Sequence, residues 1–319
     1  MTGLQAPRWL PGGHAQTIWP ALFAATGAPP PLRRERWATP DGDFVDLDFA
    51  DAAAPDAPRL VLFHGLEGSS RSHYARGFAH AAAQRGWGCV LPHFRGCSGE
   101  PNLAPRAYHA GDHEEVGWLL QRLRARQPQP LRAVGVSLGG NALLRWAEEA
   151  GGTAAATVHA LAAVCAPLDL AAGGHALGRG FNRQVYTRMF LRTLKAKAEA
   201  KWRQYPGLFD RERMRAARTL HAFDDAFVAP LHGFRGVDDY WARASARPGL
   251  ARIRVPALVL NTANDPFVPA ASLPRAHEVG ACVTLWQPPQ GGHVGFAQGR
   301  FPGHVQALPD AVLAWLAAH

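Results

Sequence analysis

The sequence predicts an α/β fold, with a mainly parallel central sheet, helices on both of its faces and a helical cap inserted at about residues 167–250. Continuous apolar runs such as Leu60–Phe63 and Ala257–Leu260 are typical of strands buried on both faces of a parallel sheet. Helical patterns alternate with these strands, and such alternation implies crossover connections. The alternation stops at about Pro167 and resumes after Leu250, so the insertion interrupts one domain spanning residues 1–319.

The elements follow in chain order. Residues up to about Pro31 are rich in Trp, Pro and Gly and match neither period, so we expect an ordered arm packed on the body. Arg34–Trp37 and Phe44–Phe49 alternate in polarity around the turn signal Pro40–Gly42, which predicts an antiparallel hairpin. Beyond Leu60–Phe63 we expect a helix over Ser72–Arg85, strand Gly88–Leu91, helix 112–124, strand Leu131–Val136 and a helix after it, strand Val158–Val164, strand Ala257–Leu260, a short helix near Ala271, a strand near Val283 and a helix from about His304 to Leu316.

The charge of the chain gives little evidence for a nucleic-acid partner. The sequence has 34 Lys and Arg against 25 Asp and Glu, a net charge of +9. Most of this excess is Arg spread through every segment, whereas nucleic-acid binders concentrate charge on one face with interleaved aromatic residues. We therefore expect no nucleic-acid binding, and the absence of long charged or repetitive blocks predicts order nearly throughout.

The cysteines indicate a reducing compartment. Cys89, Cys97, Cys165 and Cys282 form no C-x-x-C pair and no zinc-type spacing, so we expect small apolar residues and no metal site. The start, Met1–Arg8, lacks the basic and apolar regions of a signal peptide, and no apolar run is long enough to cross a bilayer. These features predict a soluble cytoplasmic protein.

Ser137 is the candidate nucleophile. It follows the apolar run Ala133–Val136, stands between Gly135 and Gly139, and precedes a helical pattern that begins at Leu138. This strand, turn and helix form the context of a nucleophile elbow, in which a strained turn exposes the serine hydroxyl. The alternative is a glycine-rich connection with an idle serine.

A serine hydroxyl needs a neutral imidazole to accept its proton and an acid to orient that imidazole. Asp265 follows the strand ending at Leu260, and His293 follows the next strand in a loop with several glycines. Taken alone, Asp265 could be a turn residue before a proline, and His293 is one of 15 histidines. Their order after Ser137, each beyond a buried strand, favours a Ser137, Asp265 and His293 triad.

The tetrahedral intermediate of acyl transfer needs backbone N–H donors. Leu138, directly after the nucleophile, is expected to supply one, and Leu66, in the loop after Leu60–Phe63, the second. Glu67 or Gly68 in the same loop are the alternatives to Leu66. We expect His64 to brace this loop, because His293 already fills the position of the base.

Several motifs resemble the YheT-like branch of the α/β-hydrolase superfamily. They are Gly13–Thr17, His64–Ser69, His93–Asn102, Gly135–Asn141, Phe223–Asp225, Asp265–Phe267 and Gly291–Phe296. The resemblance implies an α/β-hydrolase fold and an esterase or lipase-like activity with the triad above, without metal or organic cofactor. Some eukaryotic relatives carry an H-x-x-x-x-D acyltransferase motif, whereas no histidine here has Asp five positions on.

We therefore expect a serine hydrolase that cleaves small-molecule carboxylic esters through an acyl-enzyme. Thioesterase and lipase or phospholipase action use the same machinery and remain open, as does a non-catalytic ligand-binding homologue.

Within the insertion, Gln184–Trp202 is basic and amphipathic and holds all three lysines. Peripheral membrane contact is one reading of this stretch; we expect instead a cap helix over the pocket. The residues expected to form the pocket roof are Val185, Tyr186, Met189, Phe190 and Leu194. Solvated faces or packing are expected to explain Asp224, Asp225, Asp238, Asp239 and His304.

Overall fold

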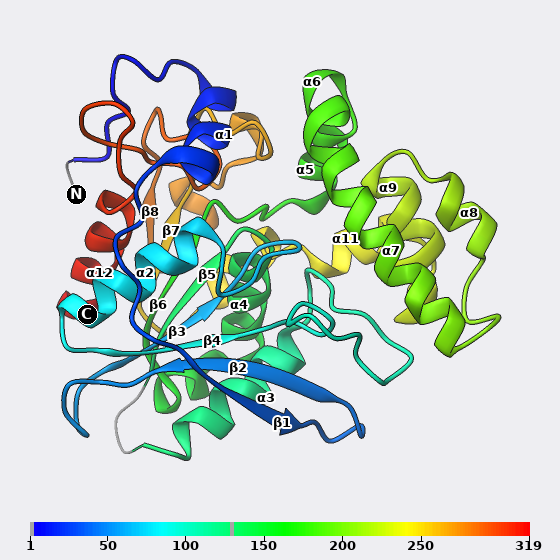
Figure 1. Cartoon of the computed structure of the whole chain (residues 1–319), viewed down its shortest axis with the longest axis horizontal. Coiled ribbons are helices and arrows are strands. Elements are labelled where there is room, and N and C mark those ends of the chain that lie inside the picture. The colour runs from blue at the N-terminus through cyan, green and yellow to red at the C-terminus, as the bar shows by residue number, and fades with distance from the viewer. Residues whose placement is uncertain (1–2, 128–130) are drawn as a thin grey trace.

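The computed structural model describes residues 3–127 and 131–319. Met1 and Thr2, which belong to the segment expected to lack a signal peptide, lie outside the described residues. Within this part of the chain an eight-stranded sheet has the order β1-β2-β4-β3-β5-β6-β7-β8 (Figure 1). β1 pairs antiparallel with β2 and β2 with β4, and the remaining pairs are parallel. The strands are β1 (Arg33–Ala38), β2 (Phe44–Ala50), β3 (Arg59–Phe63), β4 (Gly88–Pro92), β5 (Leu131–Val136), β6 (Val158–Val164), β7 (Ala257–Leu260) and β8 (Val283–Trp286).

Helices cover both faces of the sheet because successive side chains of each buried strand point to opposite sides. On β3, Leu60 and Leu62 join the core under α2 (His73–Gln84) and α12 (Ala307–Ala318). Val61 and Phe63 join the core under α3 (His113–Arg124) and α4 (Leu138–Ala150). A continuous apolar run is therefore what this strand requires.

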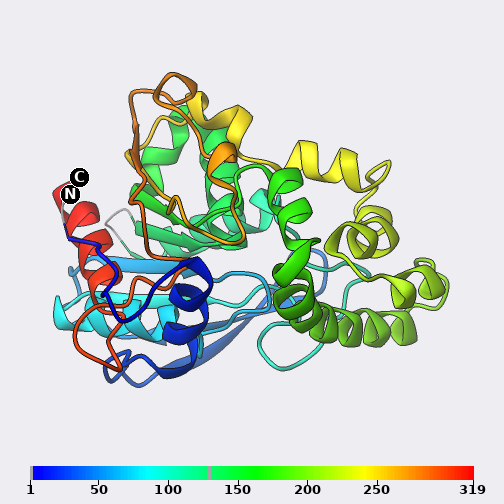
Figure 2. The same cartoon turned by 90° about the horizontal axis from the view of Figure 1, so that it is seen from above.

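The cap helices lie between the end of β6 and the start of β7, to the right of the sheet in Figure 1, and Figure 2 shows them beside the body from above. They are α5 (Leu170–Leu177), α6 (Gly180–Asn182), α7 (Arg188–Gln204), α8 (Arg211–Ala216), α9 (Leu220–Phe223), α10 (Ala229–Leu231) and α11 (Val237–Ala244). Two π-helical turns, Arg183–Thr187 and Asp224–Val228, precede α7 and α10.

The predicted α/β-hydrolase fold is confirmed, and the N-terminal arm needs one correction. It contains a helix, α1 (Gly13–Phe23), where the sequence matched no helical period. The buried residues of α1 are Gln16, Thr17 and Pro20, so its inward face is not apolar and carries no hydrophobic period.

Smaller differences concern the C-terminal elements. The expected helix near Ala271 is a single 3₁₀ turn (Ala270–Ser272), and α12 begins at Ala307, which places His304 in a loop that bridges Ala25 and Gln298. Among the helices of the described chain, none is both long and apolar enough to cross a membrane.

Candidate active site

Ser137 lies on a strained turn between β5 and α4. Its backbone has φ 53° and ψ −121°, a left-handed conformation that costs a non-glycine residue about 1–3 kcal/mol. The backbone N–H of Ser137 donates to the Val164 carbonyl oxygen at 2.8 Å, which ties the turn to β6. A Cβ on Gly139 would stand 2.5 Å from the carbonyl oxygens of Phe63 and His64, so only glycine lets α4 begin this close to β3.

Ser137, His293 and Asp265 form a continuous chain of hydrogen bonds. His293 Nε2 lies 3.0 Å from Ser137 Oγ, and His293 Nδ1 lies 2.8 Å from Asp265 Oδ2. The other carboxylate oxygen, Oδ1, accepts the backbone N–H groups of Phe267 and Val268 at 2.7 and 3.3 Å. The Phe267 ring stacks on His293 with centroids 4.1 Å apart. The imidazole is therefore held on one edge by the acid and on one face by an aromatic ring.

Helix α1 connects the two loops that carry Asp265 and His293. Gln16 Oε1 accepts a hydrogen bond from Asn264 Nδ2 at 2.8 Å and another from the Gly291 N–H at 2.9 Å, while Gln16 Nε2 donates to the Leu10 carbonyl oxygen. Gln16 is buried, so its amide is satisfied by protein groups alone.

Thr17 makes a second link from α1. Its hydroxyl oxygen accepts the backbone N–H of His293 at 2.8 Å and donates to the Gly13 carbonyl oxygen. The loop approaches so closely that a Cβ on Gly295 would stand 1.7 Å from the Gln16 carbonyl oxygen. No hydrophobic period in the sequence indicated these contacts of α1, and the Gly13–Thr17 motif is the sequence feature that coincides with them.

The loop after β3 carries Leu66, the residue expected to supply an oxyanion donor. The neighbouring N–H groups are engaged: Gly65 donates to the Tyr74 hydroxyl and Glu67 to the Tyr108 hydroxyl, each at 2.9 Å, and Gly68 donates to the Gly65 carbonyl oxygen. No acceptor within the described residues reaches the Leu66 N–H. Leu138 begins α4, where a backbone N–H has no intrahelical acceptor.

His64 braces this loop, as expected. Its Nδ1–H donates to the Gly65 carbonyl oxygen at 2.8 Å and its Nε2 accepts the Phe94 N–H at 3.1 Å. Burial lowers the pKa of His64 to about 3, so the ring is neutral. The two bonds fit the tautomer that carries its proton on Nδ1.

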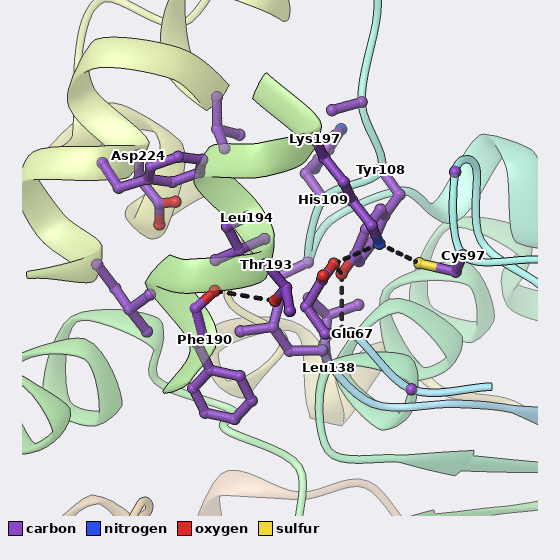
Figure 3. Close-up of a pocket in the computed structure, with 18 of the residues that line it drawn as sticks. Glu67, Cys97, Tyr108, His109, Leu138, Phe190, Thr193, Leu194, Lys197 and Asp224 are labelled. Carbon is purple, nitrogen blue, oxygen red and sulfur yellow. Dashed lines mark hydrogen bonds and ion pairs between the residues drawn. The ribbon is translucent and has the colours of Figure 1, made fainter. Parts of the chain in front are cut away.

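A polar cluster links the cap to the loop of Leu66 (Figure 3). Lys197 Nζ, on α7, lies 2.6 Å from Glu67 Oε1 and 3.2 Å from Cys97 Sγ. The Tyr108 hydroxyl donates to the same Glu67 oxygen at 2.7 Å. Burial raises the pKa of Cys97 to about 11, so its thiol is protonated. No sequence pattern indicated Tyr74 or Tyr108, because each meets the loop only in the folded chain.

A cavity of about 570 Å³ opens over Ser137 and His293 and extends under the cap. Phe190 and Leu194 line it together with Lys197 and Lys201. These positions recur at three and four residues along α7 and therefore share one face.

The predicted pocket roof is only partly correct. Val185, in the π-helical turn before α7, and Met189, on α7, are 37% and 50% exposed, and neither lines the cavity. Tyr186 is buried but packs on Phe267 and hydrogen-bonds His14 instead. Asp224, expected to be explained by packing or solvation, lines the cavity.

Among the described residues, one group of side chains could offer three ligand atoms to a metal ion. It consists of Cys165, Asp265 and His293, whose ligand atoms lie within 4.8 Å of one another. However, Asp265 and His293 bond each other, and burial raises the pKa of the Cys165 thiol well above its usual value. A protonated thiol is a poor metal ligand, so this donor set fits a proton-transfer site better.

The chain is similar to known hydrolases along most of its length. A family model described as the alpha/beta hydrolase fold matches residues 58–299. YheT of Escherichia coli (strain K12), a candidate esterase by its name, is 40% identical over 96% of this chain and 90% of that protein. The human phospholipase ABHD3 is 27% identical over 92% of this chain and 73% of that protein.

Solved structures support the fold alone, because their identities are low. Mouse alpha/beta hydrolase domain-containing protein 10 has a TM-score of 0.57 at 14% identity, over 90% of this chain and 99% of that chain. A hydrolase from Pseudomonas aeruginosa PA01 has a TM-score of 0.54 at 22% identity, over 89% of this chain and 98% of that chain.

Proposed function

The chain belongs to the α/β-hydrolase fold family, in the branch that includes Escherichia coli YheT, and we propose that it is a serine esterase that cleaves carboxylic esters through an acyl-enzyme. One observation carries this proposal. Asp265, His293 and Ser137 are joined by hydrogen bonds of 2.8 and 3.0 Å, and the serine lies on a strained turn beneath a cavity. This arrangement meets the requirements for activating a serine hydroxyl at neutral pH.

Acylation is the first half of the proposed reaction. As Ser137 Oγ attacks the ester carbonyl carbon, its proton passes to His293 Nε2, and Asp265 stabilises the imidazolium through the bond to Nδ1–H. The N–H groups of Leu66 and Leu138 stabilise the oxyanion of the tetrahedral intermediate. When this intermediate collapses, His293 returns the proton to the departing alkoxide, and the alcohol leaves with the acyl group attached to Ser137.

Deacylation repeats these steps with water. His293 takes a proton from a water molecule as the water oxygen attacks the acyl carbon, and the same two N–H groups stabilise the second oxyanion. Collapse transfers the proton from His293 to Ser137 Oγ, which releases the carboxylic acid and restores the enzyme.

The cavity favours a small-molecule acyl ester, because apolar side chains such as Phe190, Leu194 and Leu177 line much of it. A second candidate is lipase or phospholipase action, favoured by similarity to a human protein named as a phospholipase. Thioesters would use the same residues. A non-catalytic ligand-binding homologue is the remaining alternative, and the bonding of all three triad side chains favours catalysis over it.

Cytoplasmic location is part of the proposal, supported by four free cysteines. Peripheral membrane contact through Gln184–Trp202 is not part of it, because Lys197 and Lys201 on this stretch point into the protein. Lys201 donates to two backbone carbonyl oxygens, of Asn102 and Ala104.

A fluorophosphonate probe tests the proposal directly. We expect stoichiometric labelling at Ser137 and hydrolysis of p-nitrophenyl esters, with labelling abolished and turnover reduced roughly 10⁴–10⁶-fold in Ser137→Ala. Labelling at another residue, or a folded protein that neither labels nor hydrolyses any ester of a graded series, would contradict the esterase assignment. A matched series of thioesters would separate the enzymatic alternatives.

A further inference from the structure

Asp224 places a carboxyl group in the cavity at a position that the proposed chemistry does not use. It follows α9 and begins the π-helical turn Asp224–Val228, and it lines the same cavity as Ser137. In Figure 3 its carboxyl group lies to the left of α7, on the side away from Lys197. π-Helical turns are often found at functional sites.

The Asp224 carboxyl has one protein partner. Trp241 Nε1 donates to Oδ2 at 2.9 Å, and no donor among the described residues reaches Oδ1. The aromatic side chains of Phe223, Phe227 and Tyr240 line the same cavity. Burial raises the pKa of Asp224 to about 7. An acceptor oxygen in an apolar wall is costly unless a donor is supplied.

The adjacent acid provides a contrast. Asp225 Oδ1 accepts the Val237 N–H at 3.1 Å, and its Oδ2 accepts from Arg213 at 2.7 Å. Both oxygens of Asp225 therefore have a structural partner at the surface of the cap. Asp224, one residue earlier, faces the cavity with one oxygen unbonded.

Three cations of the cavity wall, Lys197, Lys201 and Arg95, are bonded to other groups. Lys197 bonds Glu67 and Cys97, and Lys201 bonds two backbone carbonyl oxygens. Arg95 makes ion pairs with Asp41, Asp43 and Glu115. None of these cations bonds Asp224, so the partner of its free oxygen has to come from what enters the cavity.

We propose that Asp224 Oδ1 accepts a hydrogen bond from an O–H or N–H group of the substrate, remote from the ester carbonyl that Ser137 attacks. The substrate class is then an ester with a hydroxyl or ammonium group at its far end. An ester that ends in a hydrocarbon would bury Oδ1 without a donor and is discriminated against. This inference rests on the proposed esterase function and adds a specificity residue to it.

The test uses esters that differ only at the far end. One series consists of p-nitrophenyl esters whose acyl chains of graded length end in methyl, hydroxyl or ammonium. The other series joins one short acid to an alkanol, a diol or an amino alcohol, which shows whether the donor lies on the acyl or the alcohol side. At the length that reaches Asp224, we expect kcat/KM for a donor-bearing ester to exceed that of the methyl ester by about 10- to 100-fold.

Two variants separate the sources of the preference. Asp224→Leu removes the acceptor and should abolish the preference, by lowering kcat/KM for the donor-bearing ester towards that of the methyl ester. Asp224→Asn keeps a neutral acceptor, so it should retain part of a preference for hydroxyl but lose one for ammonium. Asp238→Asn is the matched control, because the Asp238 side chain is 90% exposed on α11. Thermal unfolding checks that each variant is folded.

The outcomes distinguish this inference from the function on which it rests. Equal kcat/KM for all three chain ends at every length, or an unchanged preference in folded Asp224→Leu, would overturn the role of Asp224 and leave the esterase proposal standing. A parent protein that hydrolyses none of these esters and does not react with the fluorophosphonate would overturn both.

Discussion

Replacing Gln16 tests whether α1 holds the two loops of the triad in register. In Gln16→Leu, three hydrogen bonds are lost: those from Asn264 and Gly291 to Oε1, and that from Nε2 to the Leu10 carbonyl oxygen. Because Gln16 is only 1% exposed, water cannot reach the groups that lose these hydrogen bonds. Each buried group left without a partner costs about 1–3 kcal/mol, so for three groups we expect a loss of roughly 3–9 kcal/mol in the free energy of unfolding.

Gln16→Glu is the variant to compare with Gln16→Leu. A carboxylate retains the acceptor for Asn264 and Gly291 and loses only the donor to Leu10. Misplacement of a catalytic group by about 1 Å can cost 10²-fold in rate, so we expect kcat to fall about 10- to 100-fold in Gln16→Leu and much less in Gln16→Glu.

The assay combines denaturant unfolding with kcat on a p-nitrophenyl ester, under conditions where both variants are fully folded. The fraction of Ser137 that reacts with a fluorophosphonate corrects kcat for inactive protein. If folded Gln16→Leu turned over at the parental rate, α1 would stabilise the protein without positioning Asp265 and His293, and the reasoning from these bonds would be wrong.

Three further predictions follow from the site. Leu66→Ala should keep most activity, whereas Leu66→Pro, which removes the backbone N–H, should lower turnover roughly 10²–10³-fold; near-parental turnover in folded Leu66→Pro would place the donor elsewhere. Phe190→Ala should change how kcat/KM for p-nitrophenyl esters depends on acyl-chain length, and Met189→Ala should not, since Phe190 lines the cavity and Met189 does not. Equal effects of the two substitutions would contradict this. Asp224 has a pKa raised to about 7, so ionisation destabilises the folded protein progressively as pH rises from about 4 to 7. Asp224→Asn should therefore raise the Tm at pH 8 relative to the parent by more than at pH 4, and an equal difference at both values would contradict the raised pKa.

The sequence by itself determined the strands of the sheet and the chain order of the three residues proposed as a triad. Buried parallel strands are local apolar runs, and Leu131–Val136 and Val158–Val164 were predicted with the bounds that the structure has. Ser137, Asp265 and His293 could be predicted because each follows such a strand, and parallel strands end at a common edge. The structure brings these three side chains into hydrogen-bond contact, and their catalytic role stays a proposal.

Only the tertiary structure decided what surrounds the triad. Helix α1 buries Gln16 and Thr17, polar residues that leave no hydrophobic period, and their partners in the loops of Asp265 and His293 lie more than 240 residues away in the chain. The packing of the cap likewise decided which face of α7 lies over the cavity. In this packing Met189 is exposed and Phe190 lines the cavity. Periodicity and turn chemistry report the conformation of neighbouring residues. A hydrogen bond or an orientation fixed by distant segments exists only once the chain has folded, so the sequence pattern of either segment does not contain it.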